Sequence, residues 1–173
     1  MNETRYKKTS NQLPGSIIKM HIKYSITFNK TNFVIELNKM PTATVKYLGG
    51  LRTECTHLQS GTVIHTDAPT DNHGKGEKFS PTDLVATAYA SCMLSIIGIY
   101  CNEHGYHYEH GSAEVTKIME SNPRRIGKLV IEIDLRNNGW DETTIEKVKR
   151  AALACPVAKS VSEDIELEIT FHV

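Results

Sequence analysis

One segment constrains the fold of this chain more than any other: the run from Ser80 to Tyr100, which starts like a helix and is apolar almost throughout. The order Ser80, Pro81, Thr82, Asp83 supplies an N-cap hydroxyl, a proline in the first turn and a carboxylate at the third helical position. Nearly all the residues that follow are apolar or small. A helix that is apolar all round is covered on more than one face, so the sequence predicts a central buried helix that ends near Gly105.

Alternating apolar and polar residues predict strands on both sides of this helix. A second helix is expected after Asp141, with an inward stripe that reaches Cys155 before Pro156 interrupts the hydrogen-bond ladder. Residues 67–79 have the composition of a polar loop. The expected strands cover a run from Thr42, then 51–57, 62–66, about 112–120, about 128–136 and 165–173. This order of elements predicts an α+β domain with a mostly antiparallel sheet.

The two ends of the chain differ in composition. Residues 1–39 hold seven basic and two acidic side chains and no alanine, whereas residues 40–173 hold thirteen basic and eighteen acidic side chains and ten alanines. We therefore expect residues 1–39 to form a basic N-terminal extension, weakly ordered or not native, and residues 40–173 to form the folded domain. Lys19 and Lys23 interrupt the apolar stretch of the extension, which argues against a secretory signal.

Several classes of function are disfavoured by the composition. Lys plus Arg and Asp plus Glu both number 20, so the net charge gives no reason to expect binding to nucleic acid. The uninterrupted apolar runs are far shorter than the roughly 18 residues of a membrane helix, so no membrane partner is expected. The G-x-S-x-G elbow and the glycine-rich phosphate loops are missing from the sequence. With no export signal, a reducing cytoplasm is the expected compartment.

The four cysteines are too few for a disulfide-stapled protein of this length, so they are interpreted as functional thiols, metal ligands or core residues. Cys92 lies about twelve residues inside the first helix, on a stripe with Ala88, Ser95 and Ile99, and Cys155 lies on the inner stripe of the second. Both thiols are expected to point into the core from separate helices, as a peroxidatic and a resolving thiol would. Two small buried hydrophobic residues are the alternative.

The other two cysteines have less specific interpretations. Cys55 is interpreted as a packed residue on a strand. Cys101 lies about 180° round the helix from Cys92 and cannot bridge it while the helix is intact. A metal site is a separate hypothesis, because Cys101, His104, His107 and His110 recur every third residue and suit zinc or copper. Gly105 ends the helix inside this series, however, so no metal is expected.

Four short motifs together resemble the OsmC/Ohr family of peroxide-detoxifying thiol proteins, and most closely its OsmC-like branch. These motifs are TVKYLGGLR, GKGEKFSP, SPTDLVATAYASCM ending just after Cys92, and ACPVAKS around Cys155, 63 positions later. The resemblance covers residues 41–173. It implies an OsmC-like α+β fold in which antiparallel sheets wrap around central cysteine-bearing helices, and an intertwined homodimer with its active sites at the interface.

The resemblance also implies a chemistry and a set of site residues. Cys92 would attack an organic hydroperoxide, Cys155 would resolve the sulfenic acid, and an external dithiol such as a lipoyl group or a small thiol would reduce the disulfide. Arg52 in GGLR matches the family's arginine. The better-characterised branch holds that arginine with Glu ten positions before the first cysteine, where this chain has Thr82. Asp83, one place on, is either its replacement or only a helix cap.

The apolar residues near Cys92 refine the expected function. Ala88, Tyr89, Ile96 and Ile99 would line a pocket suited to alkyl or fatty-acid hydroperoxides, so a preference over hydrogen peroxide is expected. The alternative is a non-catalytic protein on the same fold that senses redox state through Cys92 or binds an apolar ligand. Turnover separates the two, because a sensor is oxidised once whereas an enzyme consumes many equivalents.

Overall fold

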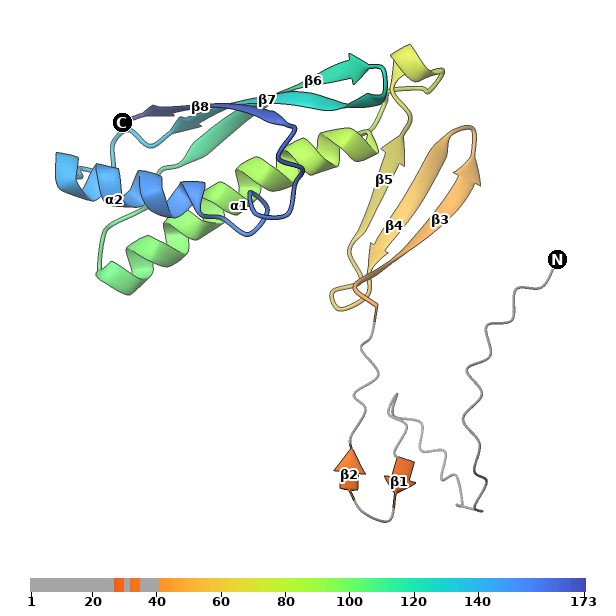
Figure 1. Ribbon diagram of the computed structural model, residues 1–173, viewed down its shortest axis with the longest axis horizontal. Helices are drawn as coiled ribbons and strands as arrows, with labels where there is room; N and C mark the ends of the chain where they lie inside the picture. Colours follow the sequence, from red (N-terminus) through yellow and green to blue (C-terminus); the bar gives the residue numbers. More distant parts are fainter. Residues whose placement is uncertain (1–26, 30–31, 35–40) are drawn as a thin grey trace. The chain divides into compact units, whose positions relative to one another are not determined.

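The computed structural model describes residues 27–29, 32–34 and 41–173 (Figure 1). The chain divides into two units, Met1–Thr42 and Ala43–Val173. In the first unit the strands β1 (Thr27–Asn29) and β2 (Asn32–Val34) pair antiparallel. Most of residues 1–39 lie outside the described residues, so the expected basic extension and the start of the domain near position 40 stay predictions.

The second unit has the predicted α+β class, with two helices and two three-stranded sheets among its residues. One sheet has the strand order β3-β4-β5 and the other β6-β7-β8. The elements, in chain order, are β3 (Ala43–Gly49), β4 (Arg52–His57), β5 (Val63–Asp67), the 3-10 turn η1 (Thr70–Asn72), α1 (Pro81–His104), β6 (Ser112–Ser121), β7 (Arg124–Asp134), α2 (Glu142–Leu153) and β8 (Glu166–His172).

The second sheet is mixed rather than wholly antiparallel. Strand β6 pairs antiparallel with β7, but β8 runs parallel to β7, with Ile131 opposite Ile169. Helix α2 lies between β7 and β8 in the chain and returns it to the starting end of the sheet, as a parallel pair requires. The expected antiparallel pattern therefore holds for every described strand pair except this one.

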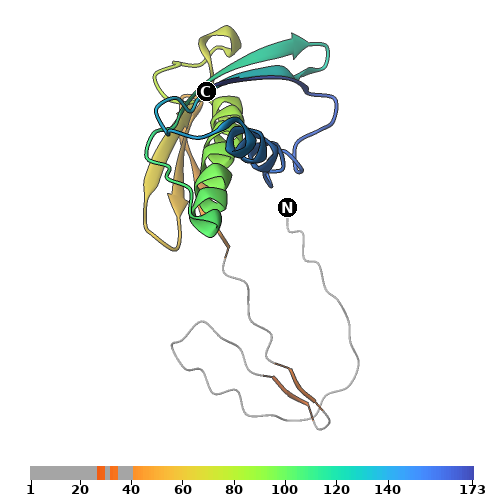
Figure 2. The same cartoon turned by 90° about the vertical axis from the view of Figure 1, so that its left-hand side faces the viewer.

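The core lies where the β6-β7-β8 sheet covers the two helices (Figure 2). Alternate side chains of β7 point inward, and Leu129, Ile131 and Ile133 are fully buried. They belong to one cluster with Met93 of α1 and Val148 of α2, which are also fully buried. The period-two pattern of β7 thus provides the surface against which both helices are fixed.

Helix α1 begins as the sequence predicts. The Ser80 hydroxyl accepts a hydrogen bond from the Asp83 amide at 3.1 Å, and the Asp83 carboxylate accepts one from the Ser80 amide at 2.7 Å. This reciprocal capping box satisfies two of the orphan amides at the start of the helix. The helix ends at Gly105, which takes the left-handed conformation with φ 70°.

The burial of α1 differs from the prediction, because one stripe of the helix is buried and the opposite face is open. The buried residues are Ala86, Tyr89, Ala90, Met93, Ile97 and Cys101. On the open face, Val85 and Ile99 are 40% and 52% exposed. By length and composition alone α1 is also apolar enough to cross a membrane, a test that the core helix of a soluble protein also passes. The apolar residues on the open face need cover, and the residues of the chain that the structure describes do not supply it.

The β3-β4-β5 sheet extends away from the pair of helices (Figure 1). Its strands alternate, so that Val45, Cys55 and Ile64 are neighbours on one face and Arg52 and Asp67 lie on the other. Val45 is 68% exposed and Ile64 is 45% exposed. One face of this sheet is therefore apolar and still open to solvent.

Candidate active site

Cys92 lies at the margin of the core rather than inside it. Its thiol is half-buried, whereas the predicted inward stripe of Ala88, Ser95 and Ile99 is exposed. The neighbours Tyr89 and Met93, on the other side of Cys92, are the buried ones. The predicted orientation was wrong because the periodicity of α1 identifies an apolar face but does not say which apolar face the same chain covers.

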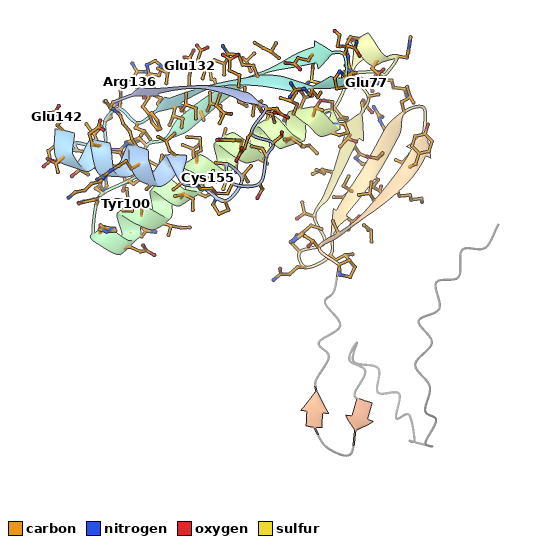
Figure 3. All side chains as sticks on the ribbon, viewed as in Figure 1. Glu77, Tyr100, Glu132, Arg136, Glu142 and Cys155 are labelled. Carbon is orange, nitrogen blue, oxygen red and sulfur yellow. The ribbon has the colours of Figure 1, made fainter. Side chains whose placement is uncertain are left out.

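Cys155 lies just beyond α2 instead of on it. The helix ends at Leu153 with Ala154 as its C-cap, and Cys155 opens the turn that follows. Pro156 has no amide hydrogen and disfavours helical geometry in the residue before it, so the helix stops earlier than predicted. Figure 3 shows Cys155 where the end of α2 meets the middle of α1. The thiol is fully buried there.

Cys92 packs against the core cluster that contains Cys155, and it lies near enough to Cys155 to raise the pKa of that thiol. Burial raises the pKa of Cys155, a hydrogen bond from the Ala158 amide opposes that effect, and the neighbouring Cys92 side chain raises the pKa further. The Ala158 nitrogen is 3.4 Å from the Cys155 sulfur. Both cysteines also act on Tyr89, whose pKa is raised by burial and then by Cys155 and Cys92. All four cysteines in the chain are free thiols.

The remaining cysteines lie apart from this pair. Cys101 is fully buried, and burial raises the pKa of its thiol. It lies on the buried stripe of α1, a different face from that of Cys92, as the helical spacing predicts. Cys55 is half-buried on β4, with its sulfur 3.8 Å from the Thr53 hydroxyl oxygen.

Arg52 opens β4 and is held by two carboxylates. Its Nε donates to Asp67 Oδ1 at 2.6 Å, and its Nη2 donates to Asp67 Oδ2 and to Glu77 Oε2, each at 2.7 Å. Hydrogen bonds from Arg52 hold the pKa of the Asp67 carboxyl below its usual value, and the two carboxylates raise the pKa of Arg52. Arg52 is thus a fixed, paired cation rather than a solvated strand charge.

Asp83 caps the helix and pairs with Lys117. Its Oδ1 accepts a hydrogen bond from Lys117 Nζ at 2.5 Å, in addition to its bond with the Ser80 amide. Burial raises the pKa of Asp83, but the hydrogen bonds from Lys117 and Ser80 outweigh that effect, so the pKa lies below its usual value. Of the two alternatives for Asp83, the structure contains the cap, while Arg52 pairs with other carboxylates.

Sequence reasoning missed Asp67 and Glu77. A partial signal for Asp67 was present in the hairpin: the turn at Ser60 and Gly61 predicts that Arg52 lies opposite residue 69, and the observed pairing, centred between Gln59 and Ser60, is with Asp67, two places earlier. Glu77 had no such signal, since it lies in a loop whose path depends on long-range hydrogen bonds. Its amide donates to Asp67 Oδ2 at 3.1 Å, and the Gly76 amide donates to the Ala68 carbonyl at 3.2 Å.

The Cys and His series at the end of α1 does not converge on one point. Cys101 is inside the core, His104 donates through Nδ1 to the Tyr100 carbonyl at 2.8 Å, and His107 lies 3.6 Å from a Glu109 carboxylate oxygen. Within the described part of the chain, no three His, Cys, Asp or Glu side chains are grouped to hold a metal ion. The series is therefore not a metal centre in this structure.

Comparison with known proteins assigns the family. The family model described as OsmC-like protein matches residues 74–170, more than half of the chain. The chain belongs to the OsmC family. A solved structure from Psychrobacter arcticus 273-4, provisionally named an osmotic stress induced and detoxification response protein, is 46% identical to this OsmC-family chain. The match covers 80% of this chain and 100% of that one, with a TM-score of 0.74.

More distant OsmC-family structures share the fold. The organic hydroperoxide resistance protein OsmC of Legionella pneumophila is 20% identical over 78% of this chain and 98% of its own, with a TM-score of 0.61. The organic hydroperoxide resistance protein OhrB of Bacillus subtilis is 17% identical over 76% and 98%, with a TM-score of 0.56. No curated protein sequence matches the chain. The predicted resemblance to the OsmC family is thus confirmed, and the family includes organic hydroperoxide resistance proteins.

Proposed function

We propose that this OsmC-family protein is a thiol-dependent peroxidase that reduces organic hydroperoxides to alcohols in defence against oxidative stress. The observation that carries the proposal is the pairing of two neighbouring thiols with unequal access to solvent. Cys92 is half-buried and Cys155 is fully buried. This difference suits Cys92 as the peroxidatic thiol, which reacts with the peroxide, and Cys155 as the resolving thiol, which reacts after Cys92 is oxidised.

The proposed cycle has three steps. The Cys92 thiolate attacks one peroxide oxygen, so that an S–O bond forms, the O–O bond breaks, and the departing alkoxide takes up a proton to become the alcohol. The Cys155 sulfur then attacks the Cys92 sulfenic acid, forming the disulfide and releasing water. An external dithiol finally reduces the disulfide to two thiols and becomes a disulfide itself.

The turn around Cys155 supports its assignment as the resolving thiol. The Ala158 amide donates to the Cys155 sulfur, with 3.4 Å between the nitrogen and the sulfur. Amide donors favour the thiolate, which is the form that attacks. The Ala158 donor partly offsets the rise in the pKa of Cys155 that burial causes.

Arg52 is the proposed stabiliser of the Cys92 thiolate and of the departing alkoxide. A guanidinium is a permanent cation whose planar array of N–H donors suits developing oxyanions. Arg52 lies on the β3-β4-β5 sheet, which extends away from the helices (Figure 1). We therefore propose that the sheet completes the active site of a second copy of the chain.

The exposed apolar surfaces support a homodimer. Val45 and Tyr47 on the sheet are 68% and 63% exposed, and Ile99 on α1 is 52% exposed. Two elements of one protomer thus present apolar faces that need cover. Light scattering on the purified protein is expected to give twice the mass of one chain. The mass of a single chain at micromolar concentration would contradict the homodimer.

The apolar surroundings of Cys92 favour organic over inorganic peroxides. Ile96 is half-buried beside Cys92, and Val85 and Ile99 lie on the open side of the same helix. Burial of an alkyl group against such side chains contributes binding energy that hydrogen peroxide cannot supply. We expect kcat/KM to be higher for tert-butyl hydroperoxide than for hydrogen peroxide, and equal values would contradict this preference.

The two-cysteine mechanism is tested by mapping oxidation. One equivalent of tert-butyl hydroperoxide is added to the reduced protein, and the cysteines are then assigned by peptide mass spectrometry. A Cys92–Cys155 disulfide is expected in the wild type and in the control Cys55→Ser, but in neither Cys92→Ser nor Cys155→Ser. Two reduced thiols with the peroxide still present would rule out the peroxidase.

The same protein distinguishes an enzyme from a redox sensor. With dithiothreitol in excess, an enzyme consumes many equivalents of hydroperoxide per protomer. A protein that is oxidised once and then stops would instead support the sensing or ligand-binding alternative. This measurement needs no knowledge of the physiological dithiol.

A further inference from the structure

Two carboxylates hold the arginine of the proposed active site, and they do so unequally. We propose that Asp67 is the positioning residue of Arg52, and that Glu77 is a restraining residue that occupies the guanidinium in the resting protein and leaves when Arg52 acts. This inference rests on the peroxidase function proposed above. It assigns to two residues of this chain a role that the start of α1 does not fill, because Asp83 there bonds Lys117 and Ser80.

Asp67 has the geometry of a fixed partner. Its side chain is 1% exposed, and both of its oxygens receive hydrogen bonds from Arg52, at 2.6 and 2.7 Å. A bidentate contact fixes the plane of a guanidinium as well as its position. The backbone of Asp67 is also anchored, because its amide donates to the Phe79 carbonyl at 3.2 Å. Asp67 therefore sets the direction in which the remaining donors of Arg52 point.

Glu77 has the geometry of an exchangeable partner. Its side chain is 61% exposed, and it receives one hydrogen bond from Arg52, through Nη2 at 2.7 Å. Exposed ion pairs of this kind are weak. Glu77 also lines a cavity of about 500 Å³ together with Lys78 and Lys117. The Glu77 carboxylate thus has space to move into, and the ammonium groups of Lys78 and Lys117 are available there as other partners.

The charges explain why Glu77 would restrain the reaction. Asp67 and Glu77 engage Nε and Nη2 of Arg52, and within the described residues the two N–H groups of Nη1 make no hydrogen bond. Two carboxylates in contact with one guanidinium leave an excess of negative charge, which opposes a nearby thiolate. The charge of Lys75 also lowers the pKa of Asp67, but by less than the contacts with Arg52 and the Glu77 amide do. Departure of Glu77 removes the excess and releases an Nη2 donor.

The two roles predict opposite effects of two similar substitutions. Asp67→Asn is expected to lower kcat/KM for tert-butyl hydroperoxide by about tenfold or more, because hydrogen bonds between charged groups are the strong ones. Glu77→Gln is expected to raise it by about two- to fivefold, the value of an exposed ion pair. The rate of Cys92 alkylation by iodoacetamide, measured without peroxide, is expected to move in the same direction as kcat/KM in each variant.

The chain offers matched controls for both substitutions. Asp134→Asn removes another bidentate partner of an arginine, since Asp134 accepts two side-chain hydrogen bonds from Arg136. Glu166→Gln removes one of two carboxylates that share a single cation, Lys128. Neither control is expected to change kcat/KM or the alkylation of Cys92. Alkylation of Cys55, on the opposite face of β4 from Arg52, is the internal reference in every sample.

The outcomes separate this proposal from the proposed function. It is overturned if the two variants shift Cys92 alkylation in the same direction, or if neither shifts it beyond the controls. If circular dichroism shows that Asp67→Asn does not fold, Arg52→Lys takes its place. The same loss of kcat/KM and of Cys92 alkylation is expected, because lysine keeps the positive charge but lacks the planar set of guanidinium donors. If the wild type turns over no peroxide but alkylation still moves in opposite directions, the peroxidase fails and the arginine network stands.

Discussion

The helix that carries Cys92 depends on Ser80, and replacing this serine gives the most quantitative test of the fold. The side chain of Ser80 is 1% exposed. Its hydroxyl accepts from the Asp83 amide at 3.1 Å and lies 3.0 Å from the Thr82 hydroxyl. Ser80→Ala removes both contacts and leaves the Asp83 amide without its partner at a buried helix start.

The expected loss of stability follows from these contacts. Replacing an N-cap serine by alanine costs about 0.5–2 kcal/mol. Because Ser80 is buried and water cannot readily replace its hydroxyl, we expect the upper half of that range, about 1–2 kcal/mol. For a domain of this size, this corresponds to a fall in Tm of roughly 4–8 °C.

The assay is urea unfolding followed by far-ultraviolet circular dichroism, with thermal melts in parallel. Ser95→Ala is the matched control, because Ser95 is exposed and its hydroxyl donates only to the Ser91 carbonyl one turn earlier in the same helix. Its loss is expected to stay within about 0.5 kcal/mol. Equal losses in the two variants would refute the reasoning that the capping box anchors α1.

Three further predictions follow from the site and its surfaces. Asp83→Asn breaks the ion pair with Lys117, so it is expected to lower Tm but to leave peroxidase kcat/KM within about twofold; a tenfold loss of activity in the folded variant would make Asp83 the partner of Arg52. The pKa of Asp67 is lowered in the folded state, so its stabilising contribution is present above the unfolded pKa of about 4 and is lost as the pH falls further. The urea midpoint of the wild type is therefore expected to fall more steeply below about pH 4 than that of Asp67→Asn, and parallel curves would contradict this. Ile99→Glu places a charge on the open face of α1, and light scattering is expected to show single chains with an unchanged circular dichroism spectrum; a persistent dimer would mean that the interface lies elsewhere.

Local signals in the sequence predicted most of the fold. The strand alternation and the cap at Ser80 depend on neighbouring residues, and the structure places the elements close to where those residues indicate. The largest shift is in β7, which starts at Arg124 rather than near residue 128, because the tight connection after β6 brings the two strands together at once. Sequence periodicity does not record where pairing begins.

The site was harder to predict because it depends on contacts between distant residues. The apolar character of α1 requires cover on all sides, but it does not distinguish cover by the same chain from cover by a second copy. The position of Cys92 was misjudged for that reason. The pairing of Arg52 with Glu77 spans 25 residues and a loop without periodicity, so no local pattern could reveal it.

The position of Cys155 outside α2 indicates which part of the molecule would move during the proposed catalytic cycle. Cys92 lies in the interior of a 24-residue helix whose backbone bonds fix it, whereas Cys155 begins a turn held by longer contacts, such as the Lys159 amide to the Cys155 carbonyl at 3.3 Å. Closing and reopening a disulfide would therefore displace the turn and leave the helix in place. Amide exchange in the oxidised protein would quicken around residues 155–161 alone, and each new hydroperoxide would meet the same helical surface as the last.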